Sequence, residues 1–357
     1  MTAKLGDHLD FSNGSSSPVR QRDGRYPVYG ANGSIGYASE PNARGPLIVL
    51  GRVGSYCGTV RYCDSDVWVT DNALVCRAKD SQETRFWYYA LQTCRLNEHR
   101  AGSGQPLLNQ RILRDVPVWA VPARDRKGIA ELLGALDDKI AGNRRAIEVA
   151  EALMVATTES VTDYVALSSL ATRSTKIVEP EDFDDVVAHF SLPAFDEDAK
   201  PEFVAGASIR SGKSLLGQPC VLFAKLNPRI ARIWNVVSLP PENEAMALAS
   251  TEFVVLRPVG VDTSALWSAV MQPQVSETLR QKVAGTSGSH QRIQPRDLLD
   301  VQVRDVRRLA PDAAQTITSF GSMCHARRDE CVRLAALRDA LLPLLMSGRA
   351  RLEPATG

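Results

Sequence analysis

An internal repeat constrains the fold of this 357-residue chain more than any other feature of its sequence. Residues 101–118 (AGSGQPLLNQRILRDVPV) and 284–303 (AGTSGSHQRIQPRDLLDVQV) each run from a Gly- and Ser-rich opening through Gln and Arg into a short apolar strand. The helical stretches that follow align at Gly134 and Gly321. The number of residues between these two glycines is nearly the same as the number that separates the two repeated stretches. Because a duplicated sequence folds into a duplicated architecture, we expect two similar halves.

Each half ends in a helical stretch with a seven-residue apolar period. The apolar side chains recur after alternating steps of three and four residues, as the a and d positions of a coiled coil do. In the first helix we expect the seam to consist of Leu133, Leu136, Ile140, Asn143, Ile147, Ala150 and Met154. The same spacing in the second helix gives Phe320, Met323, Arg327, Glu330, Leu334, Leu337, Leu341 and Leu344.

The two helices also carry a matched polar position. Asn143 aligns with Glu330, and a polar residue in a seam fixes the register of two helices at some loss of stability. No proline interrupts residues 124–160, so at about 1.5 Å per residue the first helix is expected to extend on the order of 50 Å. We predict an antiparallel coiled coil; the alternative is that each helix packs only on its own domain.

The segments before the helices are rich in glycine and in short β-branched or aromatic runs, which are typical of compact, mostly β domains. The sequence therefore predicts an α+β fold with a pseudo-two-fold internal repeat, in which two mixed, mostly β domains are each followed by a long helix. The predicted parts are a domain at residues 1–122, a helix at 123–162, a domain at 163–306, a helix at 307–349 and a disordered tail at 350–357.

The overall charge leaves the binding partner open. The chain has 42 basic and 41 acidic residues, a net charge of +1, whereas nucleic-acid binders are often strongly basic. Some stretches are nevertheless basic and free of acid. The clearest one extends from Arg210 to Arg232 and holds Arg210, Lys213, Lys225, Arg229 and Arg232.

The seven cysteines are scattered and include no C-x-x-C pair, which favours reduced thiols over disulfides. A zinc site built from Cys57, Cys63 and Cys76 is the alternative. We find neither a signal peptide nor an apolar run long enough to span a bilayer, so we expect a cytoplasmic protein without membrane contact.

Residues 207–214 (ASIRSGKS) match a relaxed sequence pattern of a phosphate-binding loop. Such a loop must open a helix, but Gly217 and Pro219 follow at once and would break one. We therefore expect Lys213 and Ser214 to meet a phosphate of a polynucleotide backbone; the alternative is a nucleotide-dependent enzyme that uses Lys213.

Further candidate nucleic-acid contacts lie in two glycine-rich loops, at residues 29–37 and 51–58, and in the repeated stretches themselves. Glycine lets a backbone approach a ligand closely, Asn or Gln pairs with adenine, and Arg pairs with guanine. Ordinary turns are the alternative for the loops. The full set of candidate contacts is Tyr29, Asn32, Ser34, Arg52, Ser55, Tyr56, Gln105, Asn109, Gln110, Arg111, Arg210, Lys213, Ser214, Lys225, Asn227, Arg229, Arg232, His290, Gln291 and Arg292.

Catalytic groups are harder to identify. The five histidines have no acid or nucleophile at a meaningful spacing, and no N-P-P-Y or D-P-P-Y tetrapeptide marks a methyltransferase pocket. We therefore expect no catalytic residue, metal or cofactor in this chain.

The segments KLGDHLDF, YPVYGANGSIGY, VLGRVGSYCGTV and TDNALV resemble the first target recognition domain of type I restriction-modification specificity subunits. SGKSLLGQPCVLFAKLNPRIAR and STEFVVLRP resemble the second domain, so the resemblance covers nearly the whole chain.

The resemblance implies a non-catalytic subunit that binds an asymmetric, bipartite target on double-stranded DNA, with the two helices setting the spacing. In the family, two modification (methyltransferase) subunits bring S-adenosylmethionine, and restriction subunits bring ATP- and Mg-dependent translocation and cleavage. A nucleoid-associated location follows from the same resemblance. The alternative is a DNA-binding scaffold of a related defence system that recruits a methyltransferase without strong sequence reading.

Overall fold

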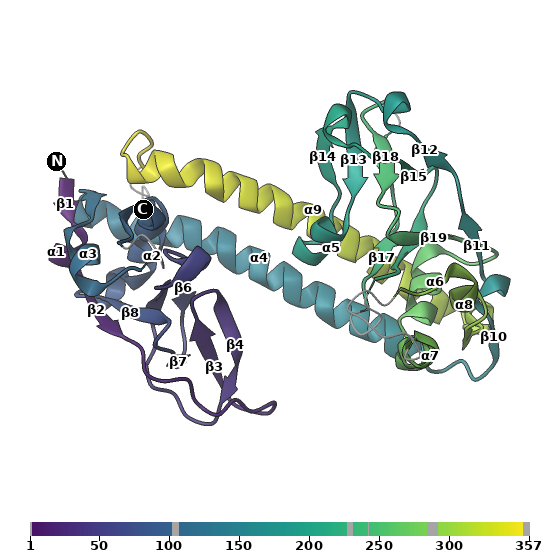
Figure 1. Ribbon diagram of the computed structural model, residues 1–357, viewed down its shortest axis with the longest axis horizontal. Coiled ribbons are helices and arrows are strands. Elements are labelled where there is room, and N and C mark those ends of the chain that lie inside the picture. Colours follow the sequence, from purple (N-terminus) through teal and green to yellow (C-terminus); the bar gives the residue numbers. More distant parts are fainter. Residues whose placement is uncertain (1, 102–106, 227–230, 242, 284–291, 353–357) are drawn as a thin grey trace. The chain divides into compact units, whose positions relative to one another are not determined.

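The computed structural model describes residues 2–101, 107–226, 231–241, 243–283 and 292–352 (Figure 1). The chain divides into unit 1, Met1–Lys139 with Leu334–Gly357, and unit 2, Ile140–Arg333. Two long helices, α4 (Ala123–Thr158) and α9 (Pro311–Met346), of 36 residues each, contribute to both units. The predicted domain boundaries stay predictions, and residues 353–357 of the predicted tail lie outside the described residues.

Unit 1 contains three antiparallel or mixed sheets. A small ladder pairs β1 (Thr2–Lys4) with β9 (Pro117–Trp119). The four-stranded sheet has the order β2 (Leu9–Asn13), β8 (Ala73–Ala78), β5 (Leu47–Gly51) and β6 (Val60–Cys63). The three-stranded sheet has the order β4 (Gly33–Ala38), β3 (Tyr26–Gly30) and β7 (Trp68–Val69). Its shorter helices are α1 (Leu5–His8), α2 (Thr84–Gln92) and α3 (Gln110–Asp115).

Helix α2 closes the core of unit 1. Its Phe86, Trp87 and Tyr89 are each at most 1% exposed and pack with β5, β8 and both long helices. Arg126 of α4 pairs with Glu83 at 2.7 Å, and its guanidinium lies 5.1 Å from the centroid of the Trp87 ring. A buried charge of this kind needs both partners, so this contact fastens the start of α4 to its domain.

Unit 2 is built on the same plan. Its small ladder pairs β10 (Tyr164–Ala166) with β20 (Gln302–Arg304). The four-stranded sheet has the order β11 (Ala171–Ser174), β19 (Phe253–Pro258), β16 (Cys220–Ala224) and β17 (Ile233–Val236). The five-stranded sheet has the order β12 (Ile177–Val178), β15 (Lys213–Leu215), β18 (Met246–Ala249), β13 (Val186–Phe190) and β14 (Glu202–Ala205). Its shorter helices are α5 (Leu192–Glu197), α6 (Thr263–Val270), α7 (Pro273–Val283) and α8 (Pro295–Leu299).

Strand order confirms the predicted repeat. The order β2-β8-β5-β6 of unit 1 recurs as β11-β19-β16-β17, all antiparallel in both cases. In the other sheet, the hairpin β3–β4 lies parallel to β7, as the hairpin β13–β14 lies parallel to β18; unit 2 adds β15 and β12. The aligned Val118 and Val303 occupy the small ladders and are 5% and 0% exposed. The α+β fold with an internal repeat is therefore as predicted.

The aligned glycines of the long helices face the equivalent short helix in both units. A Cβ on Gly134 would lie 2.7 Å from the Arg85 guanidinium, and a Cβ on Gly321 would lie 2.0 Å from Ser264 Oγ. Arg85 and Ser264 are each the second residue of the helix that follows the four-stranded sheet, α2 or α6. At Gly321 the near atoms belong to the short Ser264 side chain, so α6 approaches α9 too closely for a side chain there. At Gly134 the near atoms are the end of the flexible Arg85 side chain, which would have to move to admit one.

The seam of α4 agrees with the prediction. Leu133, Ile140, Asn143, Ile147 and Met154 are all at most 7% exposed, whereas Leu136 is half-buried. In unit 2 the two helices run antiparallel, because Ile140 lies beside Cys331 and Ile147, further along α4, lies beside the earlier Cys324. The alternative in which each helix packs only on its own domain does not describe unit 2.

The predicted seam of α9 is partly wrong. Its buried positions include Ile317, Cys324 and Cys331, which recur every seventh residue, and Leu345 falls on the same line; Leu342 and Met346 near its end are buried as well. Phe320, Met323, Glu330, Leu334 and Leu341 are half-buried, whereas Leu337 is 47% and Leu344 39% exposed. The predicted positions Met323, Glu330, Leu337 and Leu344 therefore each lie one residue before the line of buried positions. The prediction copied the spacing of the first helix and did not count the cysteines, which pack as small apolar residues.

No helix in the described ranges is both long and apolar enough to cross a membrane.

Candidate nucleic-acid interface

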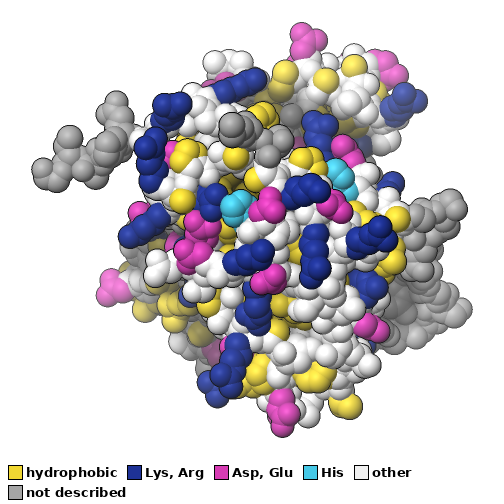
Figure 2. All heavy atoms as spheres, turned by 90° about the vertical axis from the view of Figure 1, so that its left-hand side faces the viewer, with side chains coloured by type: hydrophobic (Ala, Val, Ile, Leu, Met, Phe, Trp, Pro, Cys, Tyr) yellow, Lys and Arg dark blue, Asp and Glu magenta, His cyan; other side chains and the backbone are white. Residues whose placement is uncertain are grey.

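Basic side chains do not gather into one patch on the face of the molecule shown in Figure 2, where Lys and Arg are spread among Asp and Glu. The near-equal number of basic and acidic residues agrees with this distribution. What separates the candidate contacts is therefore whether each cation already has a carboxylate partner and whether each side chain reaches solvent.

On the hairpin β3–β4 of unit 1, Asn32 and Ser34 are exposed, and the turn between the strands depends on Gly33, whose φ is +110°. Tyr29 differs, because it packs against the apolar cluster beneath the sheet, and burial raises its pKa to about 12. Tyr29 therefore supports the hairpin, while Asn32 and Ser34 project from it.

In the loop after β5, Ser55 and Tyr56 form a short 3-10 helix, Gly54–Tyr56, and Tyr56 is 49% exposed. Arg52 is half-buried, and its carbonyl oxygen accepts a 2.9 Å hydrogen bond from the backbone N–H of Leu108. Arg52 thus connects the loop to the segment before α3, whereas Ser55 and Tyr56 reach solvent.

The repeated stretches are only partly described. Asn109 caps α3, since its Oδ1 accepts a 2.9 Å hydrogen bond from the N–H of Ile112. Gln110 is half-buried and Arg111 is exposed. In unit 2, Arg292 donates to Glu252 at 2.8 Å. The remaining candidates of these stretches, Gln105, His290 and Gln291, lie outside the described residues.

The prediction for Lys213 and Ser214 is wrong. Both lie in β15 and are only 8% and 7% exposed, so they form neither a phosphate loop nor a solvent-facing phosphate contact. Lys213 Nζ donates to Ser211 Oγ at 2.7 Å, and burial lowers the pKa of this lysine. The sequence could not reveal this, because a lysine in a short strand is ordinarily at the surface.

Arg232 already has a carboxylate partner. It donates to both carboxylate oxygens of Asp196 at 2.5 and 2.8 Å, and this hydrogen bonding raises the pKa of Arg232. Arg210 is exposed and Lys225 half-buried, and neither forms an ion pair with a described residue. Asn227 and Arg229 lie outside the described residues. The basic stretch therefore offers fewer free cations than its sequence indicates.

Among the exposed arginines of unit 1 that sequence reasoning missed, several lie on or before the hairpin β3–β4 or near its turn and form no ion pair within the part of the chain that the structure describes. They include Arg20, Arg22, Arg25 and Arg61. The signal was present in the segment VRQRDGR, where three arginines occur with a single acid.

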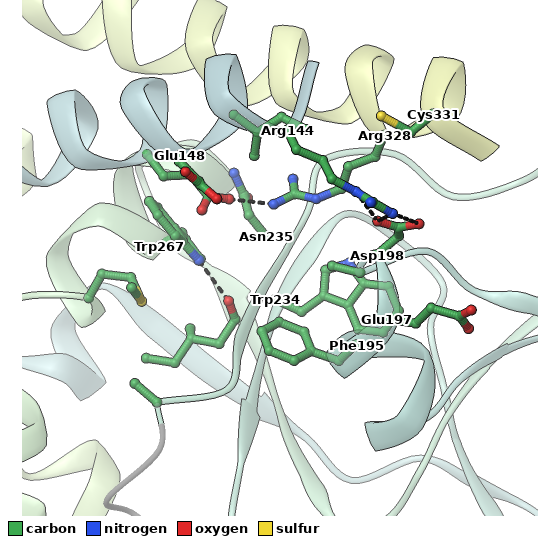
Figure 3. Close-up of a pocket in the computed structure, with 16 residues that line it drawn as sticks. Arg144, Glu148, Phe195, Glu197, Asp198, Trp234, Asn235, Trp267, Arg328 and Cys331 are labelled. Atoms are coloured by element: carbon green, nitrogen blue, oxygen red, sulfur yellow. Dashed lines mark hydrogen bonds and ion pairs between the residues drawn. The ribbon is translucent and has the colours of Figure 1, made fainter. Parts of the chain in front are cut away.

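Unit 2 holds a cavity of about 330 Å³ that α4, α5, α9 and β17 line (Figure 3). Its cations already face carboxylates: Arg144 donates to Asp198 at 2.8 and 3.0 Å, and Arg328 pairs with Glu151. The Trp267 indole N–H donates to the carbonyl of Ile233 at 2.8 Å, as Figure 3 shows. The first pair joins α4 to the β domain of unit 2, the second joins α9 to α4, and the Trp267 hydrogen bond joins α6 to β17 within the domain.

Among the described residues, no three His, Cys, Asp or Glu side chains are placed to hold a metal ion. This includes Cys57, Cys63 and Cys76, which are all buried. Burial also raises the pKa of the Cys63 thiol to about 11.

Residues 1–152 match the family model of the type I restriction modification DNA specificity domain. This region, which is less than half of the chain, is similar to a type I specificity domain. The matched residues include the whole β domain of unit 1 and most of α4, and the same strand order recurs in unit 2.

Two relatives illustrate the extent of the likeness. The chain is 27% identical over 138 residues to the type I restriction enzyme EcoprrI specificity subunit of Escherichia coli, and the match covers 38% of this chain. It spans about a third of that relative, 34% of its length. The crystal structure of the S subunit of a type I restriction-modification system from M. genitalium is 14% identical and has a TM-score of 0.62, with 97% of this chain and 96% of that chain covered.

An HsdS subunit from Thermoanaerobacter tengcongensis is also 14% identical, with a TM-score of 0.30 over 98% of this chain and 97% of that one. At these identities the M. genitalium structure supports the fold of a type I specificity protein. The residues of the interface must be assigned from this chain alone.

Proposed function

We propose that this chain is the DNA-recognition subunit of a type I restriction-modification complex. In this proposal it binds an asymmetric, bipartite target on double-stranded DNA and positions the target for partner subunits. The observation that carries the proposal is the specificity domain at residues 1–152, whose strand order is repeated in unit 2. Two copies of one reading domain match a target with two half-sites.

The different charges of the two β domains, which would each read one half of the target, support an asymmetric target. The hairpin β3–β4 of unit 1 is preceded by Arg20, Arg22 and Arg25, with Asp23 as the one acid among residues 19–38. The equivalent hairpin β13–β14 of unit 2 carries Asp196, Glu197 and Asp198 between its strands, and residues 179–185 before it include five acids. Readers so different in charge would contact different half-sites.

An exposed apolar face on α4 supports a role for partner subunits. In unit 2, Val149 is 59% and Leu153 46% exposed, and residues four apart lie on the same side of a helix. Exposed apolar side chains of this kind are typical of protein interfaces. We assign this face to the modification (methyltransferase) subunits, two per complex, which would supply S-adenosylmethionine. Restriction subunits would supply the ATP- and Mg-dependent steps, and we assign no catalytic step to this chain.

The test is a selection experiment with the assembled complex of this chain and its modification subunit. Duplexes that contain a randomised segment are bound, recovered and sequenced over several rounds. The proposal predicts enrichment of one bipartite motif with a fixed spacer and two different halves. Retention of DNA without an enriched motif would overturn sequence-specific recognition and favour a scaffold that recruits a methyltransferase without reading sequence.

A further inference from the structure

The edge strand β4 of unit 1 contains a β-bulge. In its pairing with β3, Gly36 lies opposite Val28 and Ser34 opposite Tyr29, so Ile35 between them is a bulged residue without a partner. A bulge changes the direction in which side chains point and bends the strand. Ile35 is 40% exposed, and Tyr37, two residues further along β4, is 46% exposed.

The segment Val19–Arg25 lies along this edge and is fixed to it. The backbone N–H of Gln21 donates to the carbonyl of Tyr37 at 2.9 Å. Arg20 Nη1 donates to the carbonyl of Ile35, the bulged residue, at 3.2 Å. The Cδ of Arg20 lies 3.1 Å from the position of a Cβ on Gly36, so this arginine lies against bare backbone.

Further cations lie in the segment before the hairpin and near its turn. Arg22 and Arg25 are exposed, and the Arg25 guanidinium lies 5.6 Å from the centroid of the Tyr26 ring. Exposed Arg61 reaches the turn, with its Nε 3.6 Å from the position of a Cβ on Gly33. None of these arginines forms an ion pair with a described residue, in contrast to Arg232 with Asp196. An unpaired guanidinium retains its full charge for a phosphate.

Resting on the proposed function, we infer that the hairpin β3–β4 is the reading element of unit 1 and that it enters the major groove with the outward face of β4. A two-stranded ribbon fits this groove. Arg22, Arg25 and Arg61 contact phosphates of the groove walls. Ser34, Ile35 and Tyr37 face base edges, and the apolar Ile35 suits a thymine methyl group. Arg20 is a positioning residue that holds the bulge.

The first experiment separates phosphate contacts from base contacts. The affinity of the assembled complex is measured on its selected duplex and on an unrelated duplex, over a range of salt concentrations. Arg22→Ala, Arg25→Ala and Arg61→Ala should weaken binding to both duplexes and lower the slope of log affinity against log salt by about one unit each. Arg232→Ala, whose arginine is already paired with Asp196, is the matched control and should leave the slope unchanged.

The second experiment tests base reading. Ile35→Ala should lower affinity for the selected duplex by roughly 5- to 150-fold and leave the unrelated duplex unaffected. The loss should disappear when the base pairs of one half-site are altered and persist when those of the other half are altered. Val19→Ala is the control, since Val19 is 82% exposed on the same segment but lies away from β4 pairing. Circular dichroism and thermal melting verify that each variant is folded.

The outcomes distinguish this inference from the proposed function. If the wild-type complex selects a motif but neither the arginine variants nor Ile35→Ala alters DNA binding, the reading element lies elsewhere and the inference is overturned. If these variants lose the modification subunit in gel filtration while the isolated chain still binds DNA normally, the surface is a protein interface and the inference is again overturned. If the wild-type complex selects no motif, the proposed function itself fails.

Discussion

Asn143 Nδ2 donates a 2.9 Å hydrogen bond to Glu330 Oε2, and these two residues are also partners in the sequence alignment of the two helices. Asn143 is 3% exposed, and Arg327 Nη1 donates to both Asn143 Oδ1 and Glu330 Oε2, at 3.1 and 3.0 Å. A buried polar group is stable only while its hydrogen bonds are satisfied. This layer therefore fixes the register of α4 against α9 within unit 2.

We expect Asn143→Ala to destabilise the protein by about 1–3 kcal/mol, because it removes both hydrogen bonds and leaves a gap. Chemical denaturation measures the free energy of unfolding. The control is Arg145→Ala at an exposed position of the same helix, which should change stability by no more than about 0.5 kcal/mol. Equal stability of Asn143→Ala and the wild type would contradict the assigned role.

The close approach of α6 to α9 gives a second prediction. In Gly321→Ala the new methyl group would meet Ser264 Oγ at 2.0 Å, and such overpacking costs about 1–3 kcal/mol. Adding Ser264→Gly should recover part of the loss. The matched control is Gly142→Ala, where no atom lies within 4 Å of the added Cβ, so higher helix propensity should stabilise by up to about 1 kcal/mol. The idea fails if the two alanines have the same effect.

The cap of α3 gives a third prediction. Asn109 accepts a hydrogen bond from the N–H of Ile112, so Asn109→Ala should destabilise by about 0.5–2 kcal/mol while Asn109→Asp keeps the cap. Neither variant should change which DNA motif the complex selects. A changed motif at unchanged stability would restore Asn109 to the base contacts that the sequence indicated.

The dependence of stability on pH gives a fourth prediction. Burial, reinforced by the charge of Lys213, lowers the pKa of His189 below its ordinary 6.5, and its Nε2 has no hydrogen-bond partner among the residues that the structure describes. The unfolded chain then binds this proton more readily, so stability should decrease as the pH falls from about 6.5 toward the lowered pKa.

Thermal melting between pH 7.5 and 5.0 measures this effect. His189→Gln should lose less stability over this range than the wild type does. Identical pH profiles for the two proteins would exclude the proposed role of His189.

The repeat, the two long helices and the seam of α4 could be predicted because each depends on a local period or on likeness between two parts of the chain. The seam of α9 could be predicted only in part, because small apolar cysteines replaced the larger residues that mark a heptad. The added strands β12 and β15 of unit 2 left no such signal in the sequence.

The candidate interface was less predictable, because charge compensation is a long-range property. Arg232 and Asp196 are 36 residues apart, and their pairing follows from the fold and not from local sequence. Burial of Lys213 depends in the same way on the strands around it. By contrast, the unpaired arginines before β3 were visible in the sequence and only their exposure had to be learned from the structure.

The most direct test of sequence-specific recognition is single-molecule sequencing of DNA modification in the native host, with and without this gene. The account predicts that methylation of one asymmetric, bipartite motif disappears with the gene and returns when the gene is restored. An unchanged set of methylated motifs, in a host where the modification subunit is expressed, would contradict it.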